Sequence, residues 1–344
     1  MTQWFYSYLD GRTQTVIVNG CKSNPFKASS GVAQGSRLGP LLFAAYINDR
    51  AQVINFSNFA MFADDCRLSM KIVNPQDASK LQSDITNVAS WLAANKLQIN
   101  ESKCLKITFS RLSNIFDFTY KINNIIIPEA DVVRDLGIIL DKKWSFDEQI
   151  RSITARSFRS LGFIKRITTH FSDPKTIAYL FKSLVLPGMI YGSIIWSPHH
   201  KKDFDRLNSI ITSFLRYLSY KSMSIEYHNY KELSIECKLF TMESVHKMYD
   251  MLFVYDNLSD KVNTPGFSEY FKKCNETYNL RWLRPYEEKI LKKDYLLNAP
   301  IHRLIRSWNN MLSNTRGQPK NEEKLTKDRC VLRSELLEHF VDPD

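Results

Sequence analysis

Two adjacent carboxylates, Asp64 and Asp65, stand between two short runs whose apolar patterns are typical of β-strands. The run before them is largely apolar from Asn55 to Phe62, and apolar residues alternate with polar ones from Leu68 to Ile72. This pattern predicts a β-hairpin whose turn presents both acids at its tip. Because like charges at a tight turn repel each other, such a tip suits a polycation or Mg²⁺, which prefers hard oxygen ligands. A solvated acidic turn is the alternative interpretation of the pair taken alone, so the neighbouring sequence has to decide.

A glycine-bearing loop and a helix precede the expected hairpin. Residues 30–43 read SGVAQGSRLGPLLF, in which two glycines and Gln34 form a loop that allows close approach of another backbone. Gly39 and Pro40 then open a helix, because proline is favoured near the first helical position. We expect this helix to present an apolar face and to end near Asp49. A loop, a helix and an acid-tipped hairpin, in this order, make up the second half of a polymerase palm.

These three elements resemble motifs B and C of reverse transcriptases, and most closely those of jockey-like non-LTR retrotransposons. The usual pattern in that group is SGVPQGSxLGPLLFxxYIND, followed later by FADD. The present chain has Ala33 where the usual residue is proline, and Phe62–Asp65 is its FADD.

The resemblance covers nearly the whole chain. Trp91–Lys103 resembles motif D, which closes the palm, and Asp135–Asp141 resembles the primer-grip hairpin at the palm–thumb junction. Leu161–Arg166 and Tyr191–Pro198 resemble the helical C-terminal region of the same elements. The resemblance therefore implies an RNA-directed DNA polymerase, a nucleotidyltransferase that extends a DNA 3′ end on an RNA template. Its implied partners are an RNA template, a DNA primer and deoxynucleoside triphosphates, and its implied cofactor is Mg²⁺ or Mn²⁺.

The resemblance also assigns roles to single residues. Asp64 would be a metal ligand and Asp65 its neighbour with a weaker metal role, so both are candidate catalytic residues. Lys103 would stand near the leaving pyrophosphate as a charge stabiliser or general acid, although a solvated lysine after a turn is the alternative. The remaining candidates contact substrate or template: Phe62 lies near the primer end, and Gln34 and Gly35 lie beside the template strand and the incoming nucleotide.

A third carboxylate, on a strand before motif B, completes the two-metal site of this family. Asp10 is the only acid that precedes Gly31, and Asp10-Gly11-Arg12 is a turn signature rather than the end of an apolar strand. Trp4–Gly20 instead resembles the family's segment between motifs A and B, with a strand at Thr15–Asn19. We therefore expect a truncated chain that begins inside the palm, lacks motif A and is inactive alone. The competing hypotheses are a non-catalytic module that binds nucleic acid or protein, such as a domesticated fragment, and a pseudogene product without a role.

The expected fold class is α+β, with a partial right-hand palm of antiparallel sheet and helices followed by a mainly helical thumb and C-terminal region. The expected divisions are a palm at 1–143, a helical thumb-like region at 144–225, and a helical C-terminal region at 226–344 with a linker near 314–327. In the palm we expect a helix capped by Asn74 or Asp77, with an apolar stripe through Leu81, Ile85, Val88 and Leu92. A strand at Leu105–Phe109 and a hairpin-rich stretch from Phe116 to Leu140, with a turn at Asn123-Asn124, follow it. Three amphipathic helices and a short final helix at Val331–Phe340 complete the expected elements.

The net charge of +11 is uneven, with +2 in residues 1–150 and +9 in residues 151–344. In the first thumb helix Ile150, Ile153, Leu161 and Ile164 mark an apolar side. The other sides carry the candidate nucleic-acid-binding residues Arg151, Arg156, Arg159, Lys165 and Arg166. Basic side chains at such spacing suit a phosphate-lined groove, and a merely solvated helix face is the alternative.

The six cysteines are scattered without metal-ligand spacing, and we expect reduced, mostly buried thiols in an intracellular protein. The resemblance implies a nuclear location. His199 and His200 are expected at the surface rather than in a metal site. The apolar segment Ile177–Trp196 is interrupted by Lys182 and by Pro187-Gly188, so we expect two buried helices joined by a turn and no membrane span.

Overall fold

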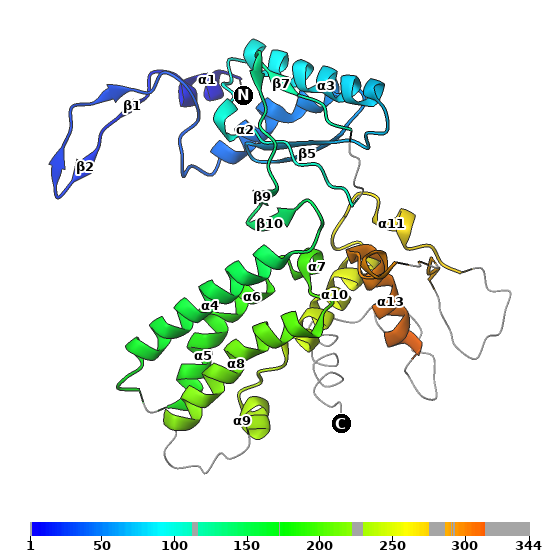
Figure 1. Ribbon diagram of the computed structural model, residues 1–344. Helices are drawn as coiled ribbons and strands as arrows, with labels where there is room; N and C mark the ends of the chain where they lie inside the picture. Colours follow the sequence, from blue (N-terminus) through cyan, green and yellow to red (C-terminus); the bar gives the residue numbers. More distant parts are fainter. Residues whose placement is uncertain are drawn as a thin grey trace. The chain divides into compact units, whose positions relative to one another are not determined.

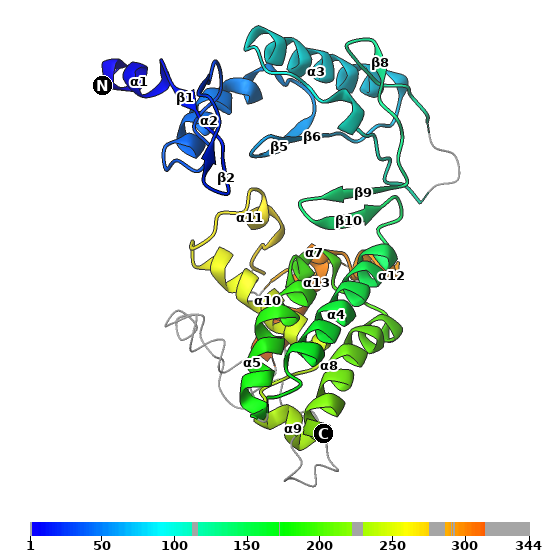
Figure 2. The ribbon, with the colours of Figure 1, turned by 90° about the vertical axis from the view of Figure 1, so that its left-hand side faces the viewer.

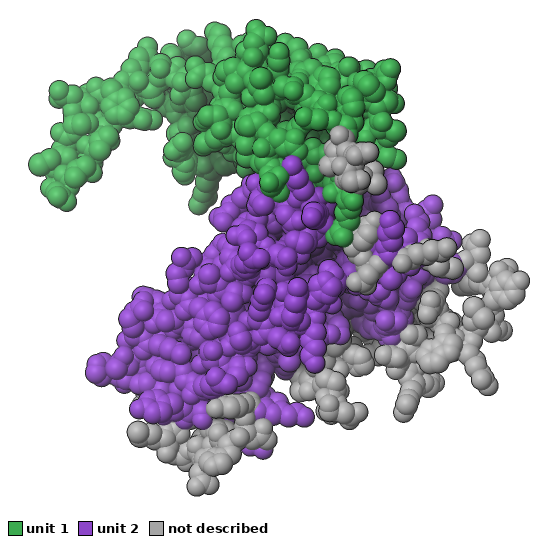
Figure 3. Space-filling model, viewed as in Figure 1, with its two compact units in different colours: residues 1–131 green, residues 132–344 purple. Residues whose placement is uncertain are grey.

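The computed structural model describes residues 2–111, 116–171, 173–221, 230–274, 286–289, 291 and 293–313. The chain forms two compact units, residues 1–131 and 132–344 (Figure 3). Helices and short antiparallel strands occur together, which confirms the expected α+β class. The finer division into palm, thumb and C-terminal region, with boundaries at 143 and 225, stays a prediction. The expected linker near 314–327 and the expected final helix lie outside the described residues.

The first unit consists of short hairpins and helices (Figure 1). Its elements are α1 (Thr2–Leu9), β1 (Thr13–Gln14), β2 (Ile17–Val18), β3 (Cys21–Lys22), β4 (Phe26–Lys27), α2 (Gly39–Ile47), the 3₁₀ helix η1 (Asn48–Val53), β5 (Asn58–Phe62), β6 (Asp65–Ser69), α3 (Pro75–Ala94), the 3₁₀ helix η2 (Glu101–Lys103), β7 (Lys121–Ile122) and β8 (Ile125–Ile126). The strands pair as β1–β4, β2–β3, β5–β6 and β7–β8, and the described residues form no larger sheet. In Figures 1 and 2, α3 runs along the β5–β6 hairpin.

Two expected strands of this unit differ from the structure. The strand expected at Thr15–Asn19 is reduced to Ile17–Val18, because Asn19 and Gly20 both take positive φ (49° and 82°) and turn the chain back into β3. The strand expected at Leu105–Phe109 is absent, and only Lys106 forms an isolated bridge, to Glu129. The neighbouring Pro128 has no N–H group, so the ladder cannot continue past it on that side.

Helices α2 and α3 of the first unit begin at the residues where the sequence predicts a helix start. The side chain of Asn74 caps α3 by accepting a hydrogen bond from the backbone N–H of Asp77 at 2.8 Å, and Pro75 follows in the first turn. Val88 of the expected apolar stripe is buried. Helix α2 begins at Gly39 and has Pro40 in its first turn, as expected. The turn at Asn123-Asn124 has positive φ at both residues and joins β7 to β8, which confirms that prediction too.

The second unit begins with one hairpin and continues as helices. Its elements are β9 (Val132–Asp135), β10 (Ile138–Asp141), α4 (Asp147–Ile167), α5 (Pro174–Leu184), α6 (Leu186–Ile190), α7 (Ser193–Trp196), α8 (Lys201–Lys221), α9 (Tyr230–Glu236), α10 (Met242–Leu258), α11 (Phe267–Tyr270), α12 (Asp294–Leu297) and α13 (Pro300–Ser313). Helices α4, α5, α6 and α8 lie side by side (Figure 2). Their core includes the stacked rings of Phe181 and Phe214, whose centroids are 4.1 Å apart. A second cluster lies between α10 and α13 around the buried Trp308. The helices expected at α4, α8 and α10 are confirmed, and α4 and α8 are amphipathic as expected, whereas α10 is buried on nearly all sides.

The apolar segment Ile177–Trp196 is helical, but its interruption lies elsewhere than expected. The chain breaks at Val185, between α5 and α6, and again at Tyr191-Gly192 before α7, so the segment contributes to three helices and not two, and Pro187 and Gly188 lie inside α6. Proline is tolerated there because the first turn of a helix does not need its N–H group. No helix among the described residues is both long and apolar enough to cross a membrane.

The cysteines are free where the structure describes them, but the expectation that most are buried is wrong. Cys237 is buried, Cys21 and Cys66 are exposed, and Cys104 and Cys274 are half-buried. Cys330 lies outside the described residues. The buried Cys237 lies in the turn directly after α9 and packs into the core of the second unit, whereas the exposed cysteines lie on two-stranded hairpins that leave one face open.

Candidate active site

The acid pair lies at the tip of the predicted hairpin. Strands β5 and β6 are antiparallel, and Phe62 pairs with Asp65, so the turn consists of Ala63 and Asp64 alone. Ala63 adopts the left-handed conformation with φ of 51°, which is uncommon for a residue with a Cβ atom. Asp64 therefore lies in the turn and Asp65 is the first residue of β6, and both are exposed. Such backbone strain concentrates at functional sites, where the surrounding structure maintains it.

The two faces of this hairpin have different surroundings. On one face Phe59 and Met61 contact Arg50 of η1, which is 4% exposed and has its guanidinium 5.5 Å from the ring centroid of Phe59. Side chains alternate along a strand, so Phe62 and Asp65 point to the opposite face. All the strand residues on that face are exposed. One face is packed in part against Arg50 through Phe59 and Met61, and the face that carries Phe62 and Asp65 is open to solvent.

The start of the hairpin is held by a buried carboxylate that the sequence analysis did not single out. Asp84 of α3 is fully buried and accepts hydrogen bonds from the backbone N–H groups of Asn55 (2.9 Å), Phe56 (3.0 Å) and Ser57 (2.7 Å), and from the Ser57 hydroxyl (2.8 Å). Burial alone would raise the pKa of this carboxyl, but the hydrogen bonds outweigh burial and hold the pKa below its usual value. A signal was present, because Asp84 lies within the apolar stripe, three residues after Leu81 and four before Val88.

The loop before α2 presents Gln34 and Gly35. Gly35 has φ of 80° with open space around it, and the Gln34 side chain is exposed. The loop is fixed at its two ends: Arg12 donates a hydrogen bond to the carbonyl of Gly31 at 2.8 Å, and the Ser36 hydroxyl accepts one from the Gly39 N–H at 2.9 Å. The loop is therefore ordered by its own flanks and leaves its middle accessible.

Two lysines near motif D differ in their surroundings. Lys106 is ion-paired to Asp117 at 2.9 Å and to Glu129 at 2.8 Å. Burial would lower its pKa, but these two carboxylates outweigh burial and raise it. Lys103, the last residue of η2, is exposed. Lys106 thus has a structural role, and Lys103 is free to meet a ligand.

The structure brings together some predicted site residues and not others. Phe62, Asp64 and Asp65 share one hairpin tip. Gln34 and Gly35 lie on the loop before α2, and Lys103 lies on η2. Within the described part of the chain, no hydrogen bond or ion pair joins these residues to the acids.

The acid pair fits part of a site for a hard divalent cation. Two exposed carboxylates supply the oxygen ligands that Mg²⁺ and Mn²⁺ prefer. Among the described residues, no group of three or more acidic, histidine or cysteine side chains could hold a metal ion. Asp64 and Asp65 can therefore provide two ligands, and further ligands have to come from substrate, solvent or another segment.

The basic residues predicted to bind nucleic acid lie on α4, and all of them are exposed, opposite the buried Ile150 and Ile164. Arg151 is 3.5 Å from Glu148 in an ion pair, and the Lys165 ammonium lies 5.6 Å from the ring centroid of Tyr217. The residues without such a partner in the described structure are Arg156, Arg159 and Arg166.

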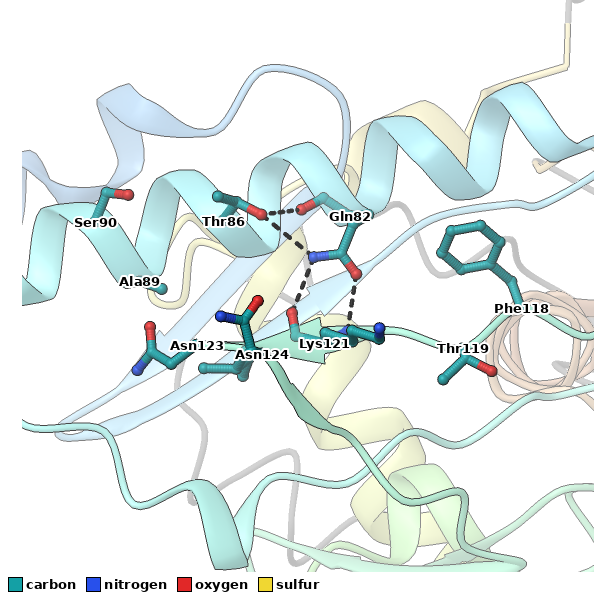
Figure 4. A pocket seen from close by; sticks show the side chains of 10 residues that line it. Gln82, Thr86, Ala89, Ser90, Phe118, Thr119, Lys121, Asn123 and Asn124 are labelled. Atoms are coloured by element: carbon teal, nitrogen blue, oxygen red, sulfur yellow. Dashed lines mark hydrogen bonds between the residues drawn. The ribbon is translucent and has the colours of Figure 1, made fainter.

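A cavity of about 490 Å³ lies between α3 and the β7–β8 hairpin (Figure 4). Beside it, the Gln82 side-chain amide donates to the Lys121 carbonyl and accepts from the Lys121 N–H, both at 2.9 Å, much as a neighbouring strand would. Its lining contains polar side chains such as Thr86 and Asn123 and none of the predicted site residues. This contact fixes the hairpin on α3.

Residues 1–164 match the family model described as reverse transcriptase (RNA-dependent DNA polymerase). The chain is 26% identical over 223 residues to a "Probable RNA-directed DNA polymerase from transposon X-element" of Drosophila melanogaster, covering 62% of this chain and 24% of the relative. It is also 26% identical over 232 residues to the "RNA-directed DNA polymerase from mobile element jockey" of Drosophila funebris, covering 63% and 25%. A "Retrovirus-related Pol polyprotein from type-1 retrotransposable element R1" of Nasonia vitripennis is 22% identical over 196 residues, covering 52% and 57%. The chain thus spans about a quarter of the length of the first two relatives. No solved structure matches it significantly.

Proposed function

We propose that this chain carries the motif C acids of an RNA-directed DNA polymerase, because residues 1–164 match the reverse transcriptase family model and its relatives include the polymerases of jockey-like non-LTR retrotransposons. The observation that supports this most directly is the exposed Asp64–Asp65 pair at the tip of the β5–β6 hairpin, which has a two-residue turn and lies inside the matched segment. The proposed substrates are an RNA template, a DNA primer and deoxynucleoside triphosphates. The proposed place of action is inside the cell, in the nucleus, as the resemblance implies.

The proposed reaction is nucleotidyl transfer to the 3′ end of the primer. Divalent cations, Mg²⁺ or Mn²⁺, supply positive charge for the attacking oxygen and the leaving pyrophosphate when they are bound. The carboxylates of Asp64 and Asp65 would hold such cations, and Phe62, exposed beside them on the hairpin, would flank the primer end. Lys103 donates hydrogen bonds or a proton to the pyrophosphate side.

The loop before α2 has a separate proposed role. The template strand and the incoming nucleotide lie against Gln34 and Gly35. A backbone with positive φ and no Cβ atom allows such a close approach at Gly35. This role agrees with a loop that is anchored at both ends and accessible in the middle.

Residues 1–143 are the proposed palm, 144–225 the proposed thumb and 226–344 a helical C-terminal region. In this arrangement the exposed side chains of α4 contact backbone phosphates, which position a duplex without reading its sequence. A non-catalytic nucleic-acid-binding module is the second candidate function, because the same basic helix would serve it without any role for the acids.

Binding of Mn²⁺ to the full chain tests the proposed role of the acids. The unmodified chain should bind Mn²⁺, and the double variant Asp64→Asn/Asp65→Asn should lose that binding. The control is Asp10→Asn, which removes one exposed carboxylate elsewhere in the first unit. Equal Mn²⁺ affinity for the double variant and the control would contradict the proposal. Duplex binding by an unmodified chain that binds no Mn²⁺ would favour the second candidate.

A further inference from the structure

We infer that Asp84 is a positioning residue for the acid pair, because its buried carboxylate fixes the segment from which the β5–β6 hairpin starts. The importance of this position for the reaction rests on the proposed function of Asp64 and Asp65. The anchoring itself does not depend on that function.

The anchored segment leads directly into the hairpin. Asn55, Phe56 and Ser57 lie between the end of η1 and the first residue of β5, and their three consecutive N–H groups all donate to Asp84. One turn further along α3, Asn87 donates to the carbonyl of Val53 at 3.2 Å. Helix α3 therefore holds the segment between η1 and β5 at both of its ends, and this fixes the direction in which β5 begins.

This direction sets where the acids lie. From Ser57 to Asp64 the chain consists of β5 and the two turn residues, which together span about 20 Å at the usual rise for a strand. Among the described residues no third strand pairs with this hairpin, so apart from the contact of Arg50 with Phe59 and Met61 its course depends on how β5 starts. A small rotation at the start therefore moves the tip by several times the displacement at the start.

The chemistry at Asp84 requires an ionised carboxylate. The described structure records no ion pair for Asp84, so its hydrogen bonds have to offset the cost of burying the charge. One carboxylate oxygen accepts from Asn55, and the other accepts from Phe56 and from both groups of Ser57. An asparagine in this place would direct an NH₂ group at one of these donors, whichever way its amide is turned.

Two variants of the full chain test the inference: Asp84→Asn, and the milder Ser57→Ala, which removes one of the four donors. Hydrogen exchange measures the start of the hairpin at residues 55–57 and the hairpin itself at residues 58–69. We expect Asp84→Asn to speed exchange at both places by about tenfold to a hundredfold, because charge-assisted hydrogen bonds are lost. Ser57→Ala should act in the same direction with a smaller effect, and it keeps the test valid if Asp84→Asn does not fold. Asp10→Asn is the matched control and should leave exchange unchanged.

The position of the acids is measured by Mn²⁺ affinity in the same variants. Weaker Mn²⁺ binding, together with faster exchange in the hairpin, is the expected result. Faster exchange at residues 55–57 alone, with the hairpin and the Mn²⁺ affinity within twofold of the unmodified chain, would overturn the inference. If Asp64→Asn/Asp65→Asn binds Mn²⁺ like the unmodified chain while the hairpin still loosens in Asp84→Asn, the proposed function fails and the positioning of the hairpin stands.

Discussion

At the scale of single residues, several polar side chains of this chain are satisfied by its own backbone. Asp141, at the end of β10, repeats the arrangement seen at Asp84: it accepts hydrogen bonds from the N–H groups of Lys143 (2.9 Å), Ser145 (2.9 Å) and Phe146 (2.7 Å). Burial would raise the pKa of the Asp141 carboxyl, but these hydrogen bonds outweigh burial and lower it. The β9–β10 hairpin, which resembles a primer grip, is thereby fixed to the start of α4.

His246 predicts a pH dependence of stability in the second unit. The ring is buried, with Nδ1 2.9 Å from the Ser197 hydroxyl and Nε2 3.2 Å from the Met189 carbonyl. A carbonyl only accepts, so Nε2 carries the hydrogen and Nδ1 accepts from Ser197. Burial, chiefly, lowers the pKa of His246 to about 4, although the Met189 hydrogen bond acts in the other direction.

The unfolded chain therefore binds a proton at His246 before the folded chain does, and stability falls as the pH drops from about 6.5 towards 4. Between pH 7 and pH 5 this loss should be about 2 kcal/mol. Urea unfolding at both pH values measures it, and His246→Gln, which can still donate to Met189, should lose that much less on acidification. Equal losses for both proteins would show that His246 is not the titrating group.

At Gly192 the addition of a single methyl group should lower the stability of the chain through a steric clash. Its φ is 66°, and a Cβ atom there would lie 2.5 Å from Cδ1 of the buried Ile138. Gly192→Ala should therefore destabilise the chain by about 1–3 kcal/mol through backbone strain and overpacking. Gly188→Ala in α6 is the control, because no atom lies within 4 Å of its Cβ position and its φ is ordinary. Thermal unfolding should show a lower midpoint for Gly192→Ala alone, and equal midpoints for the two variants would contradict the packing described.

At the scale of elements, a buried ion pair joins α13 to α10. The Arg303 guanidinium contacts both carboxylate oxygens of Asp250, at 2.8 and 3.1 Å, and donates to the carbonyl of Ile194 in α7 at 2.6 Å. Burial raises the pKa of Asp250, and Arg303 opposes that rise. Arg303 is therefore the group that favours the charged form of Asp250 against the effect of burial.

Arg303→Met should cost about 3–5 kcal/mol, because it leaves a buried acid without its partner. The control is Lys247→Met, which breaks an exposed pair with Glu243 on α10 and should cost about 0.5 kcal/mol or less. Urea unfolding compares the two. A cost for Arg303→Met as small as that of the control would show that Asp250 takes up a proton at little cost.

Elements with a strong local signal were predictable from sequence, and those that depend on a distant partner were not. Asn74 with Pro75, the apolar stripe of α4, and the Asn123-Asn124 turn each act within a few residues, and each is confirmed. The strand expected at 105–109 needed a partner, and Pro128 could not provide a full ladder. For the candidate site, the hairpin tip could be predicted from its own pattern. The role of Asp84 could not, because its donors lie about thirty residues earlier in the chain.

At the scale of the whole molecule, the excess of positive charge in residues 151–344 should govern binding to nucleic acid. Arg156, Arg159 and Arg166 are exposed on α4, and neutralising one phosphate contributes roughly 0.9 to the slope of log K against log salt on duplex DNA. The triple alanine variant should therefore weaken binding about equally for unrelated sequences and flatten that slope by up to about 3.

The control for this binding test replaces three exposed lysines of the first unit, Lys22, Lys27 and Lys96, by alanine. Replacing these lysines changes the net charge by the same amount as the triple α4 variant and leaves α4 unchanged. Filter binding or fluorescence anisotropy across a salt series measures both variants. A triple α4 variant with unchanged affinity and slope would show that the helix face is merely solvated.

The central claim is that Asp64 and Asp65 supply two of the metal ligands of a polymerase site. Primer extension on an RNA template with Mg²⁺ tests it most directly, in the 344-residue chain alone and in the same chain joined to the motif A segment of a jockey relative. The chain alone should not extend the primer, because its described residues hold no metal-binding group of three ligands. The joined protein should incorporate nucleotides in a template-dependent way, and Asp64→Ala should reduce the rate by about a hundredfold to a thousandfold. Unchanged incorporation by the Asp64→Ala variant would contradict the account.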